Sequence, residues 1–254
     1  MHFNLRTSLR SLLVGLLMAI FTAAAVFAQA PQSNCGELRL HRAGQFGPFD
    51  YRTDRSKLGI VEDYHFTPAV EALIRGSSSV IPGPDLSYTL GVFPNHHRAL
   101  LAMVRYGEKM KSPRPPGASY SVECYFDRAL RFRPDDSIVR MIYANYLSKS
   151  ARAPEAIQQL EQATAFAGNN AFSHYNIGLI YFDMKDYDRA LRQAHKAIEL
   201  GFPQTALRDR LQNVGKWTEP SGKPVIGPET APTSESADIK NSTLSNPSPE
   251  ENQK

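Results

Sequence analysis

A spacing of 34 residues is the feature that most restricts the fold of this sequence. Small residues recur at this interval, since Ala144, Ala156 and Ala163 are followed 34 positions later by Gly178, Ala190 and Ala197. Two antiparallel helices approach closely only where side chains are small, and a fixed period of this length is typical of stacked helical hairpins. The period therefore predicts an all-α solenoid.

A third copy of the repeat precedes these two. Phe126, Ala129 and Pro134 lie 34 positions before Leu160, Ala163 and Gly168. Its first helix, near residues 95–110, is separated from the second by an insertion of about seven residues at 111–117. After the last unit, apolar residues at 207, 211 and 214 predict one amphipathic helix more. We expect about three units and a capping helix over residues 95–217.

The last unit along the chain resembles a tetratricopeptide repeat (TPR). The resemblance is carried by Asn176-Ile177-Gly178-Leu179-Ile180-Tyr181, Asp186-Tyr187-Asp188-Arg189-Ala190 and Ala194-His195-Lys196-Ala197. It is strongest over residues 170–203, holds at the alanine positions of 137–169, and covers only the second helix of 95–136. The resemblance implies a right-handed helical stack with a concave groove, in a family whose members bind peptides or assemble complexes.

Motifs outside the repeat resemble a group of exported proteobacterial TPR proteins of unestablished function. They are Gly47-Pro48-Phe49-Asp50-Tyr51, Val61-Glu62-Asp63-Tyr64-His65-Phe66-Thr67-Pro68, Pro94-Asn95-His96-His97-Arg98-Ala99-Leu100 and Cys124-Tyr125-Phe126. This resemblance implies that the early segment and the repeats form one unit, and it carries no mechanism.

The N-terminus has the pattern of a secretory signal peptide. Arg6 and Arg10 precede an apolar run over residues 12–27, and small residues then favour cleavage after Ala28. The alternative is an uncleaved membrane anchor. With residues 1–28 removed, we expect a bacterial protein that is periplasmic or secreted and has no stable membrane span.

Charge and cysteine content restrict the partner and the compartment. The formal net charge is +4, and two of the basic residues lie in the signal peptide, which leaves 27 basic against 25 acidic residues. This balance argues against a nucleic-acid partner. Two cysteines in an exported chain favour a disulfide between Cys35 and Cys124, with two buried free thiols as the alternative.

The segments that flank the array have little periodicity. Residues 29–94 contain turn-forming clusters at 47–52 and 81–85, and one helix that starts at Thr67 and Pro68 and ends at Gly76. We expect this segment to be mostly irregular and to pack on the repeats. Residues 218–254 are rich in Pro, Ser, Thr, Glu and Asn without an aromatic residue, which predicts a disordered tail.

Histidines are the residues that most resemble a chemical site. An exported enzyme or metal-binding protein centred on His65, His96 and His97 is the alternative function. Adjacent residues on a helix point about 100° apart, so His96 and His97 do not suit one ion. We expect Asn95 to cap the helix, one histidine to bond the early segment and the other to face solvent or the groove.

Known catalytic and cofactor motifs are absent from the sequence. A charged loop at Asp50, Arg52, Asp54 and Arg55 is interpreted as solvated ion pairs. We therefore expect no enzyme activity, no metal and no cofactor.

The first helix of each unit supplies the predicted binding residues. By register, the inward positions are Arg140, Met141, Asn145, Phe172, Tyr175, Asn176 and Leu179. The asparagines match positions that grip a peptide carboxylate in some TPR proteins, but the lysines of that clamp are missing. An apolar groove for a protein or peptide partner of the cell envelope is our functional prediction, and the alternative is a groove filled by residues 29–94.

Overall fold

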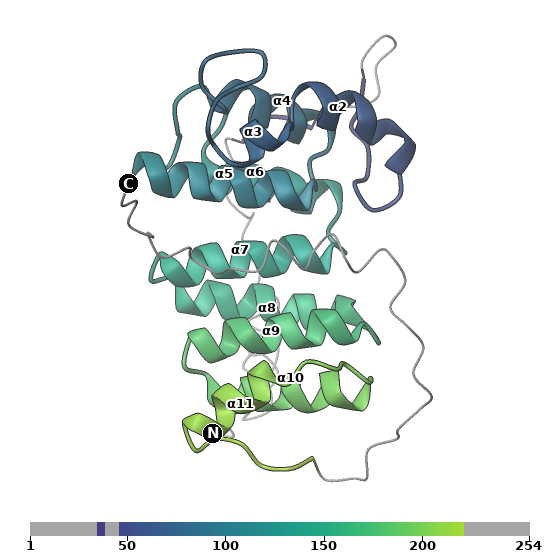
Figure 1. Ribbon diagram of the computed structural model, residues 1–254, viewed down its shortest axis with the longest axis vertical. Coiled ribbons are helices and arrows are strands. Elements are labelled where there is room, and N and C mark those ends of the chain that lie inside the picture. Colours follow the sequence, from purple (N-terminus) through teal and green to yellow (C-terminus); the bar gives the residue numbers. More distant parts are fainter. Residues whose placement is uncertain (1–34, 39–45, 221–254) are drawn as a thin grey trace, which may run out of the picture. The chain divides into compact units, whose positions relative to one another are not determined.

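The computed structural model describes residues 35–38 and 46–220. The predicted signal peptide, residues 1–28, and the predicted tail from residue 221 onward lie outside the described residues. Cys35–Lys254 form one compact unit, and its described part consists of helices and connecting loops without a strand (Figure 1). The predicted all-α class is confirmed.

Three helical hairpins follow one another through this unit (Figure 1). They are α5 (His97–Met110) with α6 (Val122–Phe132), α7 (Ser137–Lys149) with α8 (Ala153–Ala167), and α9 (Ala171–Asp183) with α10 (Tyr187–Glu199). A final helix, α11 (Ala206–Asn213), packs against α9 and α10. The predicted array of three units with a capping helix is confirmed.

The small residues of the 34-residue period lie where helices touch. Ala144, Ala156 and Ala163 have no exposed surface, and their equivalents one period later are also buried. A Cβ atom on Gly178 would lie 2.5 Å from Leu207 Cδ2, so α11 packs closely against α9 at a position without a side chain. The sequence period is therefore a period of helix contacts.

An equivalent turn introduces the first helix of each hairpin. The backbone amides of His96, Asp136 and Asn170 donate to the carbonyl oxygen three residues earlier, at 3.0, 3.2 and 2.9 Å. The side chain of each of these residues then accepts from an amide in the first helical turn. The expectation that Asn95 caps α5 is wrong, because His96 is the cap and Asn95 bonds elsewhere.

More helix precedes the repeats than the sequence predicts. The elements are a 3₁₀ helix η1 (Arg55–Lys57), α2 (Leu58–Tyr64), α3 (Pro68–Glu71) and α4 (Gly83–Val92). The cluster at 81–85 is the start of α4, because Pro84 suits the first helical turn. Helix α3 is shorter than predicted, since Leu73 takes a left-handed backbone conformation with φ of 57°.

The insertion loop at 111–117 packs on the N-terminal segment. A Cβ atom on Gly83 would lie 2.0 Å from the carbonyl oxygen of Pro116, so the loop passes directly over the start of α4. Ser87 of α4 also contacts the Tyr125 hydroxyl of α6 at 2.8 Å. The early segment and the first hairpin therefore share one hydrophobic core, while α8 to α11 share a second, and Ile138 and Tyr143 of α7 pack against both.

Candidate functional site

The predicted groove residues lie on α7 and α9, and they differ in how deeply they are buried. Asn145, Phe172, Asn176 and Leu179 are half-buried, and we call them the α7–α9 face. Met141 and Tyr175 are buried, with 5% and 6% of their surface exposed. The seventh residue, Arg140, is also buried, and its contacts show that it belongs elsewhere.

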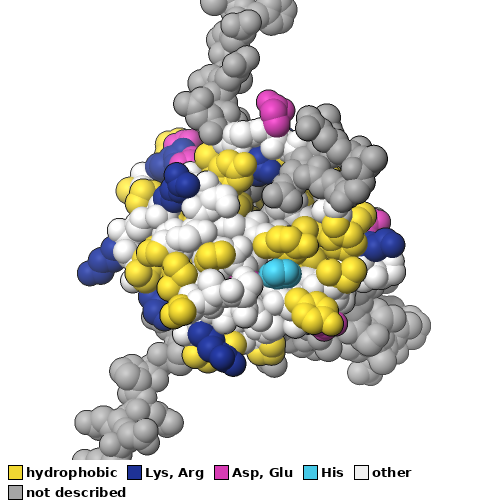
Figure 2. Space-filling model, turned by 90° about the horizontal axis from the view of Figure 1, so that it is seen from above, with side chains coloured by type: hydrophobic (Ala, Val, Ile, Leu, Met, Phe, Trp, Pro, Cys, Tyr) yellow, Lys and Arg dark blue, Asp and Glu magenta, His cyan; other side chains and the backbone are white. Residues whose placement is uncertain are grey.

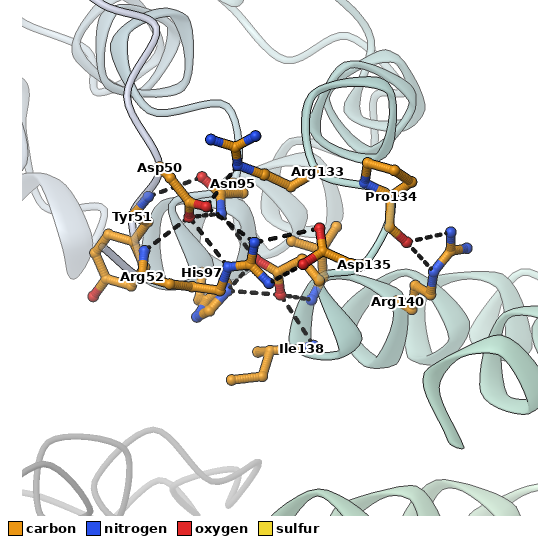
Figure 3. A network of polar contacts seen from close by, with 12 residues as sticks. Asp50, Tyr51, Arg52, Asn95, His97, Arg133, Pro134, Asp135, Ile138 and Arg140 are labelled. Carbon is orange, nitrogen blue, oxygen red and sulfur yellow. Dashed lines mark hydrogen bonds and ion pairs between the residues drawn. The ribbon is translucent and has the colours of Figure 1, made fainter. Parts of the chain in front are cut away.

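Arg140 is directed to the preceding loop and to α8. Its Nε and Nη2 atoms donate to the carbonyl oxygen of Pro134 at 2.9 and 2.6 Å (Figure 3), and its Nη1 donates to Gln159 Oε1 at 2.8 Å. The prediction that Arg140 lines the groove is therefore wrong. The side chain fixes the distance between the two helices of its hairpin.

The same arrangement recurs in the next hairpin, with His174 in place of Arg140. His174 Nε2 lies 2.8 Å from the carbonyl oxygen of Gly168, and its Nδ1 lies 2.7 Å from Gln193 Oε1. Each of these three residues comes 34 positions after its counterpart. We call this arrangement the repeat joint, and the sequence period alone is the signal that identifies it.

An aromatic residue outside the prediction covers one end of the α7–α9 face. The ring of Phe202, which follows α10, lies 4.5 Å from that of Tyr175 and 6.2 Å from that of Phe172. Burial raises the pKa of Tyr175. Asn176 donates to the Phe172 carbonyl in its own helix at 2.8 Å, whereas the Asn145 amide has no hydrogen bond to another described side chain.

The matching face of α5 is in contact with the N-terminal segment. Counted from the helix caps, Arg105 of α5 occupies the position of Asn145 in α7 and of Leu179 in α9. Arg105 Nη2 lies 3.4 Å from the Glu71 carbonyl oxygen, and Lys109 Nζ donates to that of Leu73 at 3.0 Å. The N-terminal segment therefore lies beside the groove position at the first hairpin, where Arg105 and Lys109 bond to its backbone and remain exposed.

A buried carboxylate fixes residues 50–52 to the array (Figure 3). Asp50 is 3% exposed and accepts from Asn95 Nδ2 at 2.7 Å, Arg133 Nε at 2.6 Å and Arg52 Nη2 at 3.0 Å. Burial raises the pKa of Asp50, but hydrogen bonds from Arg52, Asn95 and Arg133 outweigh this effect and hold it well below its usual range. The interpretation of this loop as solvated ion pairs is wrong for Asp50.

A second buried carboxylate adjoins the first. Asp136 accepts from His97 Nε2 and from Asn95 Nδ2, both at 2.9 Å, while it caps α7. Burial again raises the pKa of Asp136, and its bonds to His97, Asn95 and the Val139 amide lower it below its usual value. Asn95 thus joins both carboxylates, and we call this cluster the Asp50–Asp136 network.

The comparison with protein families classifies the last hairpin. Residues 171–201, which include α9 and α10, match the family model described as a tetratricopeptide repeat. The chain contains a tetratricopeptide repeat. TPR proteins are generally non-enzymatic scaffolds, and the repeat indicates a role in binding other proteins. A search of curated proteins finds no match to the chain.

The histidines of the TPR array are held by structural contacts. His96 has no exposed surface, and its Nδ1 accepts from the Ala99 amide at 3.2 Å, so the ring proton is on Nε2, 3.2 Å from Glu62 Oε1. Burial lowers the pKa of His96 more strongly than Glu62 raises it. The expectation that one of the adjacent histidines faces solvent or the groove is wrong, because His97 is bonded to Asp136.

Metal binding finds no support in the described part of the chain. Residues 35–38 and 46–220 contain no group of three His, Cys, Asp or Glu side chains placed to hold an ion. His65 is separate from the other two histidines, since its Nδ1 pairs with Asp85 Oδ1 at 3.0 Å. The three histidines of the alternative function therefore do not form one site.

A disulfide joins the start of the described chain to the first hairpin. Cys35 and Cys124 are bonded, as the sequence predicts. Arg128 of α6 donates to the carbonyl oxygens of Cys35 and Glu37 at 3.0 and 2.8 Å. Residues 35–37 are thus fixed to α6 by a covalent bond and by a buried guanidinium.

Two hollows of the TPR array lie away from the predicted groove residues. The larger, about 450 Å³, is lined by Ala153 and Ile157 of α8, the turn at 184–188 and Lys216. The smaller, about 210 Å³, lies between α8 and α10. Neither of these two hollows is lined by the α7–α9 face, whose side chains are half-exposed. Among the described residues, no helix is long and apolar enough to cross a membrane.

Proposed function

We propose that this protein is a periplasmic adaptor or assembly factor of a bacterial cell envelope, without enzyme activity, that binds a segment of a partner protein on the α7–α9 face. One observation carries the proposal. On the matching face of α5, Arg105 and Lys109 are directed to backbone carbonyl oxygens of the N-terminal segment. Asn145 and Leu179, at the positions of α7 and α9 equivalent to Arg105, are half-exposed.

The chemistry of the α7–α9 face favours an extended peptide segment. The Asn145 amide can donate to a peptide carbonyl and accept from a peptide N–H, while Leu179 and Phe172 offer apolar contact. No lysine clamp accompanies the asparagines, so a free C-terminal carboxylate is not required of the partner. The face therefore selects an internal segment with apolar side chains.

Export to the periplasm is supported by the sequence and by the disulfide. The first 28 residues have the pattern of a signal peptide. Disulfides form and persist in oxidising compartments such as the bacterial periplasm. The Cys35–Cys124 bond is consistent with such a compartment.

A crosslinking pull-down from envelope extract tests the binding face. The test variant carries Asn145→Ala and Leu179→Ser, and the matched control carries Glu161→Ala and Phe166→Ser on α8, where both side chains are exposed. We expect a partner that is captured by wild type and by the control and is lost from the test variant. All three proteins must keep the same helical circular dichroism.

Two results would contradict the proposal. A partner retained by the test variant would exclude the α7–α9 face as its site. Loss of the same partner from the control alone would move the site to α8.

A further inference from the structure

Exposed apolar side chains are concentrated at one end of the described unit. Eight large hydrophobic residues are exposed in the described part of the chain, and five of them lie between residues 60 and 81. These five are Ile60, Tyr64, Ile74, Val80 and Ile81, and we call them the N-terminal apolar patch. Single exposed apolar residues are common on soluble proteins, but a cluster of this kind marks an interaction surface.

Asp85 joins the end of α2 to the loop between α3 and α4, the two segments that carry the patch. Its buried carboxylate pairs with His65 at the end of α2 and accepts from the amides of Ser77 and Ser78, at 2.8 and 3.1 Å, in the loop that carries Val80. The end of α2 and the loop therefore lie side by side. Figure 2 views this end of the molecule and shows hydrophobic side chains on both sides of a histidine.

The loop presents its apolar side chains in a fixed conformation. The Gly76 amide donates to the Val80 carbonyl at 3.3 Å, and the Ser79 hydroxyl donates to that of Ile81 at 2.7 Å. Val80 is 89% exposed and Ile74 is 77% exposed. Two aliphatic side chains thus project from a loop whose conformation is stabilised by hydrogen bonds within the loop.

Basic side chains predominate among the exposed charged residues of the segment that carries the patch. The exposed charged side chains between residues 55 and 81 are Arg55, Lys57 and Arg75, which are basic, and Asp63, which is acidic. Glu71 is half-buried and bonded to Arg98, which also lies 3.5 Å from Glu62. Three exposed cations against one exposed anion give this end of the molecule a net attraction for anionic surfaces.

We propose that the N-terminal apolar patch is a peripheral membrane-binding surface that binds to an anionic lipid bilayer. Projecting aliphatic side chains insert at the boundary between headgroups and acyl chains, while adjacent Lys and Arg side chains meet the headgroups. Neither of the two hollows described above is lined by the patch. A second copy would bring equal positive charges face to face.

This surface is distinct from the α7–α9 face and adds a second activity to the proposed function. The patch belongs to α2 and to the loop between α3 and α4, whereas the proposed peptide face belongs to α7 and α9. An adaptor with both surfaces would hold its partner segment beside a membrane. Each surface has its own test, so failure of one leaves the other standing.

Vesicle co-sedimentation tests the proposal, with oxidised protein from residue 29 onward, which contains the whole compact unit Cys35–Lys254. Vesicles of phosphatidylcholine alone are compared with vesicles that also contain phosphatidylglycerol. We expect binding to the anionic vesicles that weakens as salt is raised. The variant Ile74→Ser with Val80→Ser should bind them at least roughly tenfold more weakly, because both inserting side chains are lost.

Two further variants separate insertion from general adhesion. Phe166→Ser with Val214→Ser removes two exposed apolar side chains outside the patch, and this control should bind the vesicles as wild type does. Lys57→Glu with Arg75→Glu should abolish the preference for anionic vesicles. Helical circular dichroism shows that each variant is folded.

Several outcomes would overturn the proposal. They are no binding to anionic vesicles, equal binding to neutral ones, undiminished binding by the Ile74→Ser and Val80→Ser variant, or equal loss in the control. A dimer in sedimentation that this same variant abolishes would assign the patch to a second copy of the chain.

Discussion

The two halves of the described unit hold their helices together by different means. The N-terminal half, up to α6, relies on a disulfide and on large side chains such as Phe93 and Phe126, and the Asp50–Asp136 network joins it to the cap of α7. The C-terminal half, from α7 to α11, relies on buried alanines at a fixed period and on the repeat joint. A repeat carries its packing within its own period, whereas an irregular segment needs specific bonds to distant residues.

Loss of the disulfide should have the largest effect on the free energy of unfolding and should destabilise the N-terminal half more than the C-terminal half. Cys35 and Cys124 are 89 residues apart, and the chain-entropy model assigns about 4.6 kcal/mol to a crosslink over such a loop. We expect Cys35→Ala with Cys124→Ala to lower the free energy of unfolding in urea by about this amount. Hydrogen exchange should accelerate first in α2 to α6.

The reduced wild type is the control for that variant. Reductant should lower the stability of wild type and leave the double variant unchanged. Equal acceleration of hydrogen exchange in α9 and α10 would show that the two halves unfold as one.

Removal of a buried carboxylate should have the next largest effect. Asp50→Asn leaves Arg52 and Arg133 without their shared partner, and we expect a loss of about 3 kcal/mol in the free energy of unfolding. The matched variant in the C-terminal half is Asp183→Asn, whose carboxylate is half-exposed beside Arg210. Its expected loss is below about 0.5 kcal/mol. Equal losses would remove this distinction between the halves.

The Asp50 carboxylate determines part of the loss of stability at low pH. The pKa of Asp50 is lowered in the folded state, so its contribution is present above the unfolded pKa of about 4 and is lost as pH falls toward the folded pKa. The free energy of unfolding of Asp50→Asn should therefore depend less steeply on pH below about 4 than that of wild type. Parallel curves would exclude this role.

The repeat joint offers a test within the C-terminal half. His174→Ala removes the ring that contacts the carbonyl oxygen of Gly168 and the Gln193 side chain. We expect the free energy of unfolding to fall by about 2 kcal/mol. His174→Arg should cost less than half of that, since Arg140 makes the equivalent contacts one period earlier. Urea unfolding measures both. Equal losses would mean that the two joints are not interchangeable.

The smallest expected effect concerns the cap of α5. Burial lowers the pKa of His96 from 6.5, so below this pH the unfolded chain binds a proton that the folded chain does not. The free energy of unfolding therefore falls as pH falls through this window. His96→Asn keeps a capping side chain of the kind that Asn170 supplies to α9 and should flatten the dependence between about pH 7 and 5. An unchanged slope would exclude His96 as its source.

Features of the fold that repeat with the period were predictable from the sequence. The alanines at 144, 156 and 163 and their equivalents predict the hairpins because they lie at the contacts that make the array. The capping helix was predictable from its apolar spacing. The Cys35–Cys124 pairing was the bond favoured for the two cysteines.

Long-range polar contacts were not predictable in this way. Asn95 bonds Asp50 and Asp136, which are 45 and 41 positions away, and no local pattern marks such a pair. Arg140 was assigned to the groove because register alone does not tell which side of α7 faces α8. One period and an insertion of seven residues before Asp136 give Asn95, whereas the observed spacing of the caps makes His96 the equivalent of Asp136 and Asn170.

The repeat joint and the shared turn make the length of this protein adjustable in fixed steps. Deletion of residues 137–170 would connect Asp136 directly to Ala171, where Asp136 replaces Asn170 as the cap of α9. His174 would then meet the carbonyl oxygen of Pro134 in place of that of Gly168. The shortened chain would retain the shared turn and the repeat joint. It would lose the contacts of Glu123 with Tyr143 and Arg152, because Ile177 and Asp186 stand one period later. The turn and the joint are therefore the transferable part of each hairpin, and the other contacts belong to a single interface.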